Sequence, residues 1–378
     1  MPPVTGPWST PAAAADGGLP RTLVLTGHFP PAGGGVQRFT WELVRRLPAD
    51  RVVVVAPHTP GDAAFDRRLP FPVLRRHGYL LSLDLDRIVA QHGCTAAWIP
   101  AAAPIGLFAP SLRRAGIGHI VASTHGQEIG WLRASPTKGA LREIAGWVDV
   151  VTYLTNWSRE LLNKELVGPM CRLVGGVDVM EYSPGEWRPK LRPRVVSVGR
   201  LVRRKGQDNL LRAWPAVLAE QPDALLTIVG AGPYAPALQR LAGRLRLGDS
   251  VDFRGYLSQS DQVAALRAAD VLVTPSRDDR HGLQTEGLAL TTLEGSAVGL
   301  PVVVGRSGGS AESLVDGTTG FLVDTGPEAL AAPILALLAD PELARTMGSA
   351  GRQWVRDSFS WDASADVLRR LLTTGGDA

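Results

Sequence analysis

Residues 286–309 read EGLALTTLEGSAVGLPVVVGRSGG, and the fold can be worked out from this stretch. Glu286 and Glu294 stand eight positions apart, and a glycine follows each of them. The pattern predicts a loop that carries Glu286, a helix over 290–298 that carries Glu294, and a buried parallel strand at 302–304. The free N–H groups of a helix N-terminus bind anions, and carboxylates beside them can hold hydroxyls, so the stretch is typical of a site for a phosphate that carries a sugar. The alternative is an acidic first turn that complements the helix dipole.

Short apolar runs alternate with helix-forming segments in both halves of the chain. Strands are predicted at residues 23–25, 52–55, 98–100, 119–123, 148–153, 195–199, 225–229, 251–253, 271–274, 302–304 and 321–323. Helices are predicted at 36–47, from 84 to 91, at 158–166 and 208–220, after 233 up to about 247, at 259–268 and 290–298, near 312, and in three stretches up to 372. This alternation indicates an α/β protein of two Rossmann-like, doubly wound domains with a cleft between them.

The chain is long enough for two domains, and a polar, proline-rich stretch at 183–193 predicts the boundary. The predicted divisions are a tail at 1–20, an N-terminal domain at 21–185, a C-terminal domain at 186–355, and a segment at 356–378 with a helix that packs back on the N-terminal domain. The first 20 residues are rich in Pro, Ala and Gly, with no basic residue and no continuous apolar core. We therefore expect a flexible tail and not a signal peptide.

Composition leaves the class of ligand open. The 378 residues are 45% hydrophobic, and the net charge of +4 suits an anionic ligand or a membrane surface without requiring either. No nucleic-acid partner is expected, and the sequence sets no oligomeric state. Cys94 and Cys171 have no metal or redox spacing, and no stretch approaches the ~20 apolar residues of a membrane span. We expect a cytoplasmic protein, either free or peripheral on the inner face of the plasma membrane.

Two loops that follow predicted strands carry residues suited to phosphate. Residues 27–35 are rich in glycine and precede a helix, and glycines let a ligand approach the backbone closely. Their spacing is not G-x-G-x-x-G, which makes the loop a weak signal by itself. Residues 199–206 read GRLVRRKG, in which Arg200 offers a planar fork to phosphate oxygens and Lys205 a compact charge. The alternative is a solvated basic loop.

Two further motifs bear on the chemistry. His125 comes after the predicted strand 119–123, at the carboxyl end where open α/β sheets bind ligands, although a packed side chain is the alternative. Asp84-Leu85-Asp86 has the D-x-D spacing of a metal site. An N-cap and a first-turn acid at the start of a helix explain it better, so no metal site is predicted.

A basic stretch lies at residues 66–80, in the N-terminal half. Its charged residues are Arg67, Arg68, Arg75, Arg76 and His77, and they are interleaved with Leu74, Tyr79, Leu80 and Leu81. A solvated face is the usual meaning of such a pattern. The sharper interpretation is contact with acidic lipid headgroups.

The combined motifs resemble family 4 of the retaining glycosyltransferases. They are the glycine-rich loop at 33–35, GRLVRRKG at 199–206, IVGAGP at 228–233, the E-x7-E pair of Glu286 and Glu294, and GLPVV at 299–303. The resemblance covers residues 21–374 and is closest to the GDP-mannose-dependent mannosyltransferases that act on phosphatidylinositol mannosides. That narrower match depends on STHGQEIGW at 123–131, VDVVTYLTNWS at 148–158, GGVDVMEYSP at 175–184, RLVRRKGQDNLL at 200–211 and GLQTEGL at 282–288.

The resemblance implies the GT-B fold, in which two Rossmann-like domains face each other and the second holds most of the donor. It implies that His125, Arg200, Lys205 and Glu286 are catalytic, and that the donor-binding residues are Gly34, Gly35, Gly199, Arg200, Lys205, Glu286, Leu290, Thr291 and Glu294. Arg200 and Lys205 would hold the diphosphate, Glu286 the hydroxyls of the transferred sugar, and Glu294 the ribose. The implied substrates are a nucleotide-diphosphate sugar, GDP-mannose first, and a phosphoinositide-type glycolipid, with no cofactor and no metal. The family's usual account is front-face attack assisted by the leaving phosphate.

Two departures from the family pattern affect the donor more than the reaction. Ala289 stands where the family has glycine, and Thr291 and Thr292 stand where the mannosyltransferases have Val and an aromatic residue. Because the fold fixes neither substrate, a soluble aminocyclitol or other small-metabolite acceptor also stays open as an alternative, with a UDP- or GDP-sugar as donor. A nucleotide-sugar epimerase or a non-catalytic binder on the same fold is the alternative from another class. A nicotinamide oxidoreductase lacks support, because no G-x-G-x-x-G precedes an acid by about twenty residues.

Overall fold

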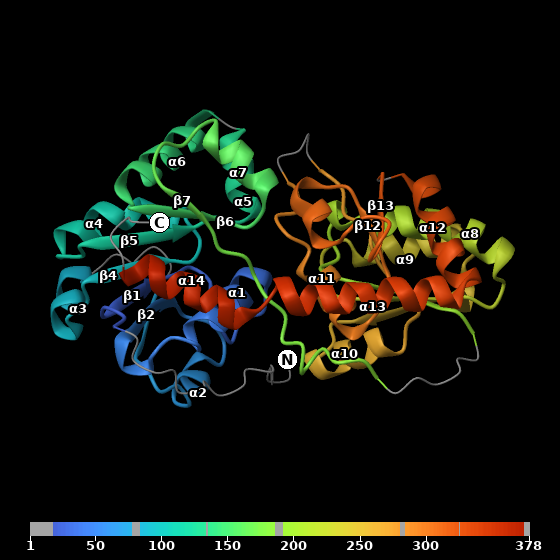
Figure 1. Cartoon of the computed structure of the whole chain (residues 1–378), viewed down its shortest axis with the longest axis horizontal. Helices are drawn as coiled ribbons and strands as arrows, with labels where there is room; N and C mark the ends of the chain where they lie inside the picture. Colours follow the sequence, from blue (N-terminus) through green and yellow to red (C-terminus); the bar gives the residue numbers. More distant parts are fainter. Residues whose placement is uncertain are drawn as a thin grey trace. The chain divides into compact units, whose positions relative to one another are not determined.

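The computed structural model describes residues 18–77, 84–133, 135–185, 192–279, 284–324 and 326–373. The chain divides into two compact units (Figure 1). The first unit comprises residues 1–175 together with 361–378, and the second unit comprises residues 176–360. The sequence analysis predicts the domain boundaries at 185/186 and 355/356, whereas the two units change at 175/176 and 360/361. Most of the predicted tail, and Tyr79, Leu80 and Leu81 of the basic stretch, lie outside the described residues.

The first unit is built on a parallel sheet whose seven described strands run in the order β3-β2-β1-β4-β5-β6-β7. Their bounds are β1 Thr22–Leu25, β2 Val52–Pro57, β3 Val73–Arg76, β4 Ala96–Ile99, β5 His119–Ser123, β6 Val150–Tyr153 and β7 Met170–Arg172. Thr22 is in register with Val52 on one side and with Ala96 on the other. Strand order reverses between β1 and β4, and at such a switch point the loops after the strands diverge and leave room for a ligand.

Helices cover the first sheet. They are α1 Gly35–Val44, α2 Asp62–Asp66, α3 Leu85–His92, α4 Ala109–Arg114, α5 Gly126–Leu132, α6 Ser135–Trp147, α7 Asn156–Asn163 and α14 Trp361–Thr373, with the 3-10 turns η1 Ala49–Arg51 and η3 Ile105–Phe108. The last helix, α14, lies beside α1 (Figure 1). It is fixed there by an ion pair from Arg46 to Asp362 at 2.7 Å and by a hydrogen bond from Ser364 to the carbonyl of Val174 at 2.8 Å.

The second unit has a parallel sheet whose six described strands run in the order β10-β9-β8-β11-β12-β13. Their bounds are β8 Arg194–Val198, β9 Leu225–Val229, β10 Val251–Gly255, β11 Val271–Thr274, β12 Val302–Gly305 and β13 Gly320–Val323. The helices are α8 Gln207–Glu220, α9 Ala235–Arg244, α10 Gln259–Arg267, α11 Leu290–Val298, α12 Pro327–Ala339 and α13 Pro341–Ser358, with the 3-10 turns η4 Arg203–Lys205, η5 Gly248–Ser250 and η6 Gly308–Ser313. Both sheets thus have the architecture that the alternating pattern predicts.

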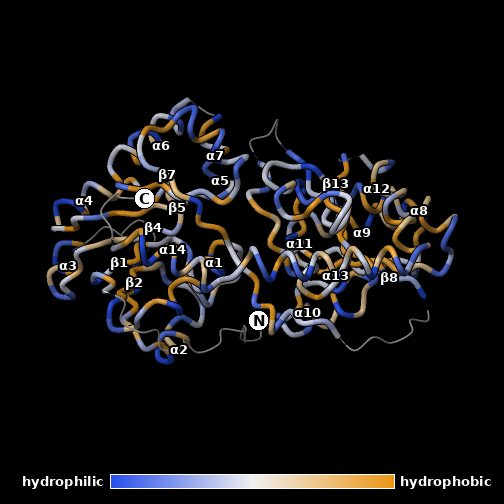
Figure 2. The backbone as a smooth tube through the Cα atoms, viewed as in Figure 1, coloured by the Kyte–Doolittle hydropathy of each residue, from blue (hydrophilic) through white to orange (hydrophobic). Residues whose placement is uncertain are grey.

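Each unit has a core of its own. Figure 2 shows the hydrophobic residues concentrated along the strands, and the polar residues on the loops and outer helix faces. The strands β1, β4, β11 and β12 are buried along their whole length because helices cover both faces of each parallel sheet. This explains why the continuous apolar runs of the sequence, with no alternation, are strands.

Every predicted strand is present, and the predicted helix 290–298 coincides with α11. The sequence analysis misses β3 and β7, which are the two edges of the first sheet. Edge strands are covered less completely, and these two are short and end in arginine, so neither shows the run that marks a buried strand. The helices α2, α4, α5 and α6 are missed as well, and the helix predicted near 312 is the 3-10 turn η6.

Two features bear on the compartment. None of the helices within the described ranges combines the length and the apolar character that a bilayer crossing requires. Cys94 and Cys171 are both free thiols. Burial raises the pKa of Cys94 to about 11, because its effect exceeds the lowering of the pKa by the nearby charge of Arg21. This thiol is therefore unreactive at neutral pH.

Candidate active site

Glu286 is a buried carboxylate in the second unit, with 7% of its surface exposed. It lies in the loop that leads to α11, as the sequence predicts. Lys205 Nζ donates a hydrogen bond to its Oε2 at 2.6 Å, and Arg204 Nη1 donates to the same oxygen at 3.0 Å. A third donor, Ser276 Oγ, lies 3.2 Å from that oxygen. Within the described ranges, all hydrogen bonds of this carboxylate therefore go to one oxygen.

The backbone of Glu286 is fixed by the loop that follows β12. Its N–H donates to Ser307 Oγ at 3.3 Å, and its carbonyl accepts the N–H of Gly309 at 2.8 Å. Ser307 Oγ in turn donates to Asp278 at 2.8 Å. Two loops at the carboxyl ends of neighbouring strands, β11 and β12, thus hold the carboxylate in position.

Charge decides the protonation state of Glu286. Burial by itself would raise the pKa of this carboxyl, since it removes water from the charged form. The positive charges of Lys205 and Arg204, together with the hydrogen bonds from Lys205 and Ser276, outweigh burial and lower the pKa below its ordinary value. Glu286 is therefore ionised at neutral pH and can accept hydrogen bonds from hydroxyl groups.

The loop that carries Lys205 has a tightly specified backbone. Gly206 has a φ of +70°, and a Cβ added there would lie 1.8 Å from the carbonyl oxygen of Pro275. The N–H of Arg277 donates to the carbonyl of Arg204 at 2.8 Å, and the Arg277 guanidinium pairs with buried Asp208 at 2.9 Å. Glycine at the end of η4 thus allows the loop after β8 to lie directly against the end of β11.

Arg200 lies earlier in the same loop and differs from Lys205 in its surroundings. Its side chain is exposed, and it makes no hydrogen bond or ion pair with the residues that the structure describes. Gly199, the residue before Arg200, directly follows β8. The loop after β9 lies close to the carbonyl of Gly199. A Cβ added at Gly230 in that loop, where φ is +139°, would lie 1.9 Å from this carbonyl oxygen. The Gly230 loop thus serves contact between two loops, and Arg200 keeps its guanidinium available.

Glu294 lies inside α11, in its second turn, and is 5% exposed. Gln262 Nε2 donates to its Oε2 at 3.0 Å. The first turn of α11 holds no acidic residue and no side-chain cap, so the alternative of an acidic first turn does not apply here. The predicted donor residues Leu290 and Thr291 are the first two residues of this helix and are half-buried.

The residues that depart from the family pattern lie at the start of α11. Ala289 is the N-cap residue, with a φ of −81°, so its backbone needs no glycine. Thr292 is fully buried, and its hydroxyl lies 2.9 Å from that of Thr274 on β11. Of the two threonines, only Thr291 therefore stays a candidate for contact with a ligand. The threonine at 292 fixes the helix to the sheet.

His125 is the N-cap of α5 in the first unit, at the carboxyl end of β5. Its Nε2 lies 2.8 Å from the carbonyl oxygen of Pro100, and its ring meets that of Phe39 edge-on at 4.9 Å. The backbone N–H of His125 donates to Glu128 at 2.7 Å. The imidazole is thus oriented by packing and by one carbonyl, and it is half-buried.

The glycine loop after β1 lies at the same edge of the first sheet. Gly34 and Gly35 are exposed, and a Cβ added at Gly35 would meet no atom within 4 Å. The loop also carries His28, which the sequence analysis passes over. Burial and then the charge of His125 lower the pKa of His28, so His28 is neutral at pH 7.

The basic stretch of the first unit is not one continuous exposed surface. Arg75 lies on β3 with 6% of its side chain exposed, and it pairs with Asp66 at 2.8 Å and donates to the carbonyl of Pro30 at 2.6 Å. This burial leaves Arg75 little surface for the predicted contact with lipid. Arg76 is half-buried and donates to the carbonyl of Arg75. Arg67, Arg68 and His77 are exposed.

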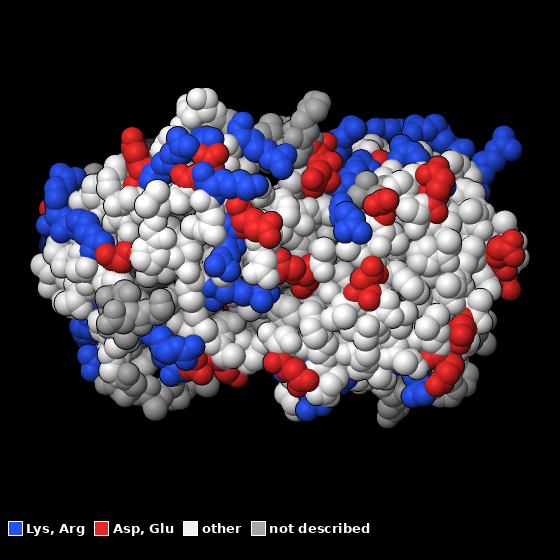
Figure 3. Space-filling model, turned by 45° about the horizontal axis from the view of Figure 1, so that its top comes forward, with Lys and Arg blue, Asp and Glu red and all other residues white. Residues whose placement is uncertain are grey.

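Charges of both signs are mixed on the surface. Figure 3 shows Lys and Arg residues in several separate groups on the face drawn, with Asp and Glu residues beside them. Among the described residues, no three His, Cys, Asp or Glu side chains are arranged to hold a metal ion. Asp84, of the D-x-D motif, is the N-cap of α3, with a left-handed φ of 59° and no capping bond from its side chain. Asp84 thus occupies the N-cap position that the sequence predicts, but its side chain makes no capping hydrogen bond.

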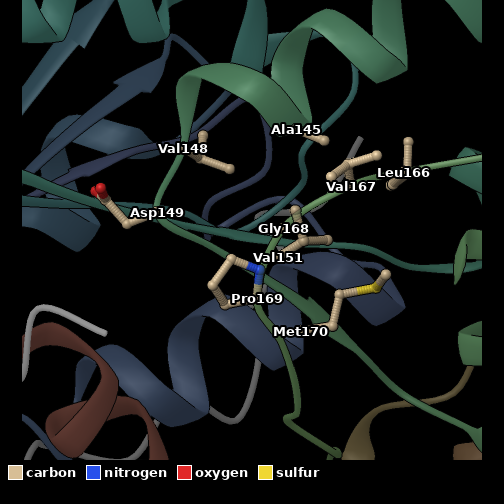
Figure 4. A pocket seen from close by; sticks show the side chains of 9 residues that line it. All are labelled: Ala145, Val148, Asp149, Val151, Leu166, Val167, Gly168, Pro169 and Met170. Carbon is tan, nitrogen blue, oxygen red and sulfur yellow. The ribbon is translucent and has the colours of Figure 1, made fainter. Parts of the chain in front are cut away.

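A small pocket in the first unit lies away from these residues. It has about 10 Å³ of space, enough for one water, and is lined by Ala145, Val148, Asp149, Val151, Leu166, Val167, Gly168, Pro169 and Met170 (Figure 4). Asp149 comes just before β6 and Pro169 just before β7. The pocket is therefore at the amino ends of the strands, the edge opposite to that of His125, and it plays no part in the candidate site.

The comparison with known proteins agrees with this geometry. The family model Glycosyltransferase Family 4 matches residues 33–181, and the model Glycosyl transferases group 1 matches residues 181–354. A GDP-mannose-dependent alpha-(1-6)-phosphatidylinositol monomannoside mannosyltransferase of Mycolicibacterium smegmatis is 38% identical over 93% of this chain and 98% of its own length. The chain belongs to glycosyltransferase family 4. The resemblance of the motifs is thereby confirmed, and the protein is a glycosyltransferase.

Two further comparisons extend this result. A GDP-mannose-dependent monoacylated alpha-(1-6)-phosphatidylinositol monomannoside mannosyltransferase of Corynebacterium glutamicum is 33% identical to this glycosyltransferase, over 93% of this chain and 97% of the other. The crystal structure of the Anabaena protein HepE in complex with UDP matches with a TM-score of 0.81 and 19% identity, over 93% of this chain and 99% of that one. This structural match confirms the GT-B fold.

Several residues of the site could not be found from the sequence. Arg204 and Ser276 both contact Glu286, and Ser307 fixes its backbone. Serines that follow strands β11 and β12 give a weak signal, because such positions often lie at a ligand-binding edge. Arg204 gives none, since it is one of three consecutive basic residues.

Proposed function

We propose that this glycosyltransferase moves mannose from GDP-mannose to a phosphoinositide-type glycolipid, with retention at the anomeric carbon and without a metal ion. The observation that carries the proposal is full-length similarity, at 38% and 33% identity, to two mannosyltransferases named for that donor and for that class of acceptor. The buried, ionised Glu286 between two cations supports it, because a carboxylate of this kind suits the hydroxyls of a sugar beside a diphosphate.

The donor's two halves are assigned to different residues. Lys205 and the exposed Arg200 take the diphosphate, and their charges stabilise the leaving group. Glu286 accepts hydrogen bonds from the hexose hydroxyls at C3 and C4. Glu294 holds the ribose. Gly199 and the first amides of α11, at Leu290 and Thr291, complete the donor site.

The first unit contributes the acceptor side. His125 takes the position beside the sugar and the acceptor hydroxyl, while the exposed Gly34 and Gly35 offer N–H groups to the diphosphate. In the reaction the bond from the anomeric carbon to the phosphate oxygen breaks, and GDP leaves with the electron pair. The acceptor oxygen then forms the new bond on the same face, and its proton passes to the departing phosphate.

The first experiment tests the donor. Thermal shift with GDP, UDP and ADP identifies the base, and a panel of labelled nucleotide sugars then identifies the sugar that is transferred to lipid extracts. We expect stabilisation by GDP and label from GDP-mannose in a glycolipid whose new linkage is α. Stabilisation by UDP alone, with label from a UDP-linked hexose, would overturn the donor assignment. A β-linked product would overturn retention.

A soluble acceptor such as an aminocyclitol is the second candidate, and the burial of Arg75 favours it, since fewer cations are left for a membrane contact. The exposed Arg67, Arg68 and His77 still support peripheral binding, at ~1 kcal/mol for each basic residue near an anionic surface. Sedimentation with anionic vesicles distinguishes the two. Binding at low salt with release at high salt supports the glycolipid. Transfer to a soluble cyclitol without vesicle binding would replace it.

A further inference from the structure

Two neighbouring cations share one oxygen of Glu286. Lys205 Nζ and Arg204 Nη1 lie 2.6 and 3.0 Å from Oε2, and both side chains are largely covered, with 18% and 21% exposed. The carboxylate carries one negative charge and contacts two positively charged groups. The two cations repel each other, which reduces the net attraction within the group, and a second anion would relieve that repulsion.

A donor diphosphate would be that second anion, and it would compete for Lys205. The ammonium group is a compact point charge on a flexible stem, which can turn from a carboxylate to a phosphate. If Lys205 were the sole partner, its turn toward phosphate would leave Glu286 buried and unpaired. An unpaired buried charge is strongly destabilising, so the sugar-binding carboxylate would be lost when it is needed.

We propose that Arg204 is a positioning residue, which keeps the Glu286 carboxylate ionised and oriented while the donor diphosphate engages Lys205. The inference deepens the proposed function and rests on it. Arg204 would act through Glu286 on the recognition of the sugar, and it would make no contact with the phosphates.

The backbone around Arg204 supports a fixed position. Its carbonyl accepts the N–H of Arg277 at 2.8 Å, and Arg277 is itself held by Asp208 at 2.9 Å. Successive residues of a 3-10 turn point about 120° apart. The preceding Arg203 accordingly points elsewhere, with its guanidinium carbon 5.7 Å from the ring centre of Tyr234.

The same turn therefore offers a matched control. Arg203 carries the same charge, is exposed, and has no contact with Glu286. The experiment compares Arg204→Ala, Arg204→Lys and Arg203→Ala with the unchanged protein. Calorimetry measures Kd for the bare nucleoside diphosphate and for the nucleotide sugar that the unchanged protein transfers. Steady-state kinetics give kcat and KM for the donor as a function of pH.

For Arg204→Ala we expect the preference for nucleotide sugar over bare nucleotide to fall about tenfold or more, as loss of one charge-assisted contact permits. Binding of the bare nucleotide should change less than about threefold. The fall of kcat on the acid side should move to higher pH, because Lys205 and Arg204 are the charged groups that contact Glu286 among the residues the structure describes, and Asp278 reaches it through Ser307. Arg204→Lys should restore most of the preference, and Arg203→Ala should behave as the unchanged protein does.

Two results would overturn the inference. One is equal weakening of nucleotide and nucleotide-sugar binding by Arg204→Ala, which would make Arg204 a phosphate ligand. The other is identical behaviour of the Arg204→Ala and Arg203→Ala variants. Failure of the unchanged protein to use GDP-mannose would instead refute the proposed donor, and the comparison would still be decided with the sugar nucleotide that it does use.

Discussion

Lys205 Nζ lies 2.6 Å from Glu286 Oε2, which joins the end of the loop after β8 to the loop that precedes α11. One ion pair thus links the two parts of the second unit to which we assign the diphosphate and the sugar. A ligand that takes Lys205 changes the charge around Glu286 as well. Binding of the phosphates and recognition of the sugar are therefore expected to be coupled.

Lys205→Ala should lower turnover by about a hundredfold or more, because it removes one of the two charges to which we assign stabilisation of the leaving diphosphate. The measurement is kcat with the preferred donor. Arg203→Ala, in the same turn and without contact to Glu286, serves as the control. A loss of less than about threefold in the Lys205 variant would contradict the role given to this cation.

Transfer should continue in excess EDTA. In the proposed function Arg200 and Lys205 supply two positive charges to the diphosphate, and no cluster of His, Cys, Asp or Glu among the described residues has the arrangement of a metal site. The measurement compares initial rates with and without chelator, and after addition of magnesium. Complete loss in EDTA with recovery by magnesium would show that the proposal without a metal is wrong.

Much of the second unit could be predicted because its signals are local. Apolar segments on either side of Gly299 and Pro301 mark α11 and β12, and the spacing of Glu286 and Glu294 separates loop from helix. Arg204 could not be distinguished from Arg203 by any pattern. Only the geometry of η4 directs one side chain to Glu286 and the other to Tyr234.

The first unit was harder to predict for a different reason. Arg75 has the sequence surroundings of an exposed basic stretch, and it becomes buried because Asp66, nine positions earlier, and the carbonyl of Pro30 meet it in the fold. The rings of Phe39 and His125 meet edge-on although the two residues are 86 positions apart in the sequence, and their contact depends on the order of β1, β4 and β5. Contacts at such separations leave no periodic signal in the chain.

Glu286→Ala should weaken discrimination among sugars more than it weakens binding of the bare nucleotide. In the proposed function this carboxylate accepts hydrogen bonds from the sugar, and its pKa is lowered from 4.5 despite burial, by Lys205, Arg204 and Ser276. A lowered pKa means that the ionised form is kept above pH 4.5 and is lost only as the pH falls through the lower value of the folded protein. Activity should thus be independent of Glu286 titration between about pH 5 and 8.

Calorimetry with GDP, GDP-mannose and GDP-glucose measures this discrimination, with the pH profile of kcat beside it. Equal losses for nucleotide and nucleotide sugar in the Glu286 variant would mean that this carboxylate does not bind the sugar. An acid limb above pH 5 in the unchanged protein, absent from Glu286→Gln, would contradict the lowered pKa.

Arg75→Gln should destabilise the first unit by about 3–5 kcal/mol, because it leaves the Asp66 carboxylate and two carbonyls without their buried cation. Arg68→Gln is the matched control, since Arg68 is exposed, and it should change the free energy of unfolding by less than about 0.5 kcal/mol. Urea unfolding measures both. Equal stability of the two variants, with weaker vesicle binding by Arg75→Gln, would restore Arg75 to the membrane contact.

Gly206→Ala should reduce stability and activity together, because the added Cβ would lie 1.8 Å from the carbonyl oxygen of Pro275 at a backbone φ of +70°. The left-handed backbone alone costs about 1 kcal/mol for alanine, and relief of the overlap requires η4, and with it Lys205, to move away from β11.

Gly243→Ala is the control in the same unit. Gly243 lies in α9 with no atom within 4 Å of the added Cβ, so alanine there should stabilise the helix by about 0.5–1 kcal/mol. Calorimetric Tm should fall for the first variant and hold or rise for the second, and kcat should fall only for the first. Normal turnover in a destabilised Gly206→Ala protein would show that the position of Lys205 does not depend on this contact, and that the loop can reach the donor from more than one backbone conformation.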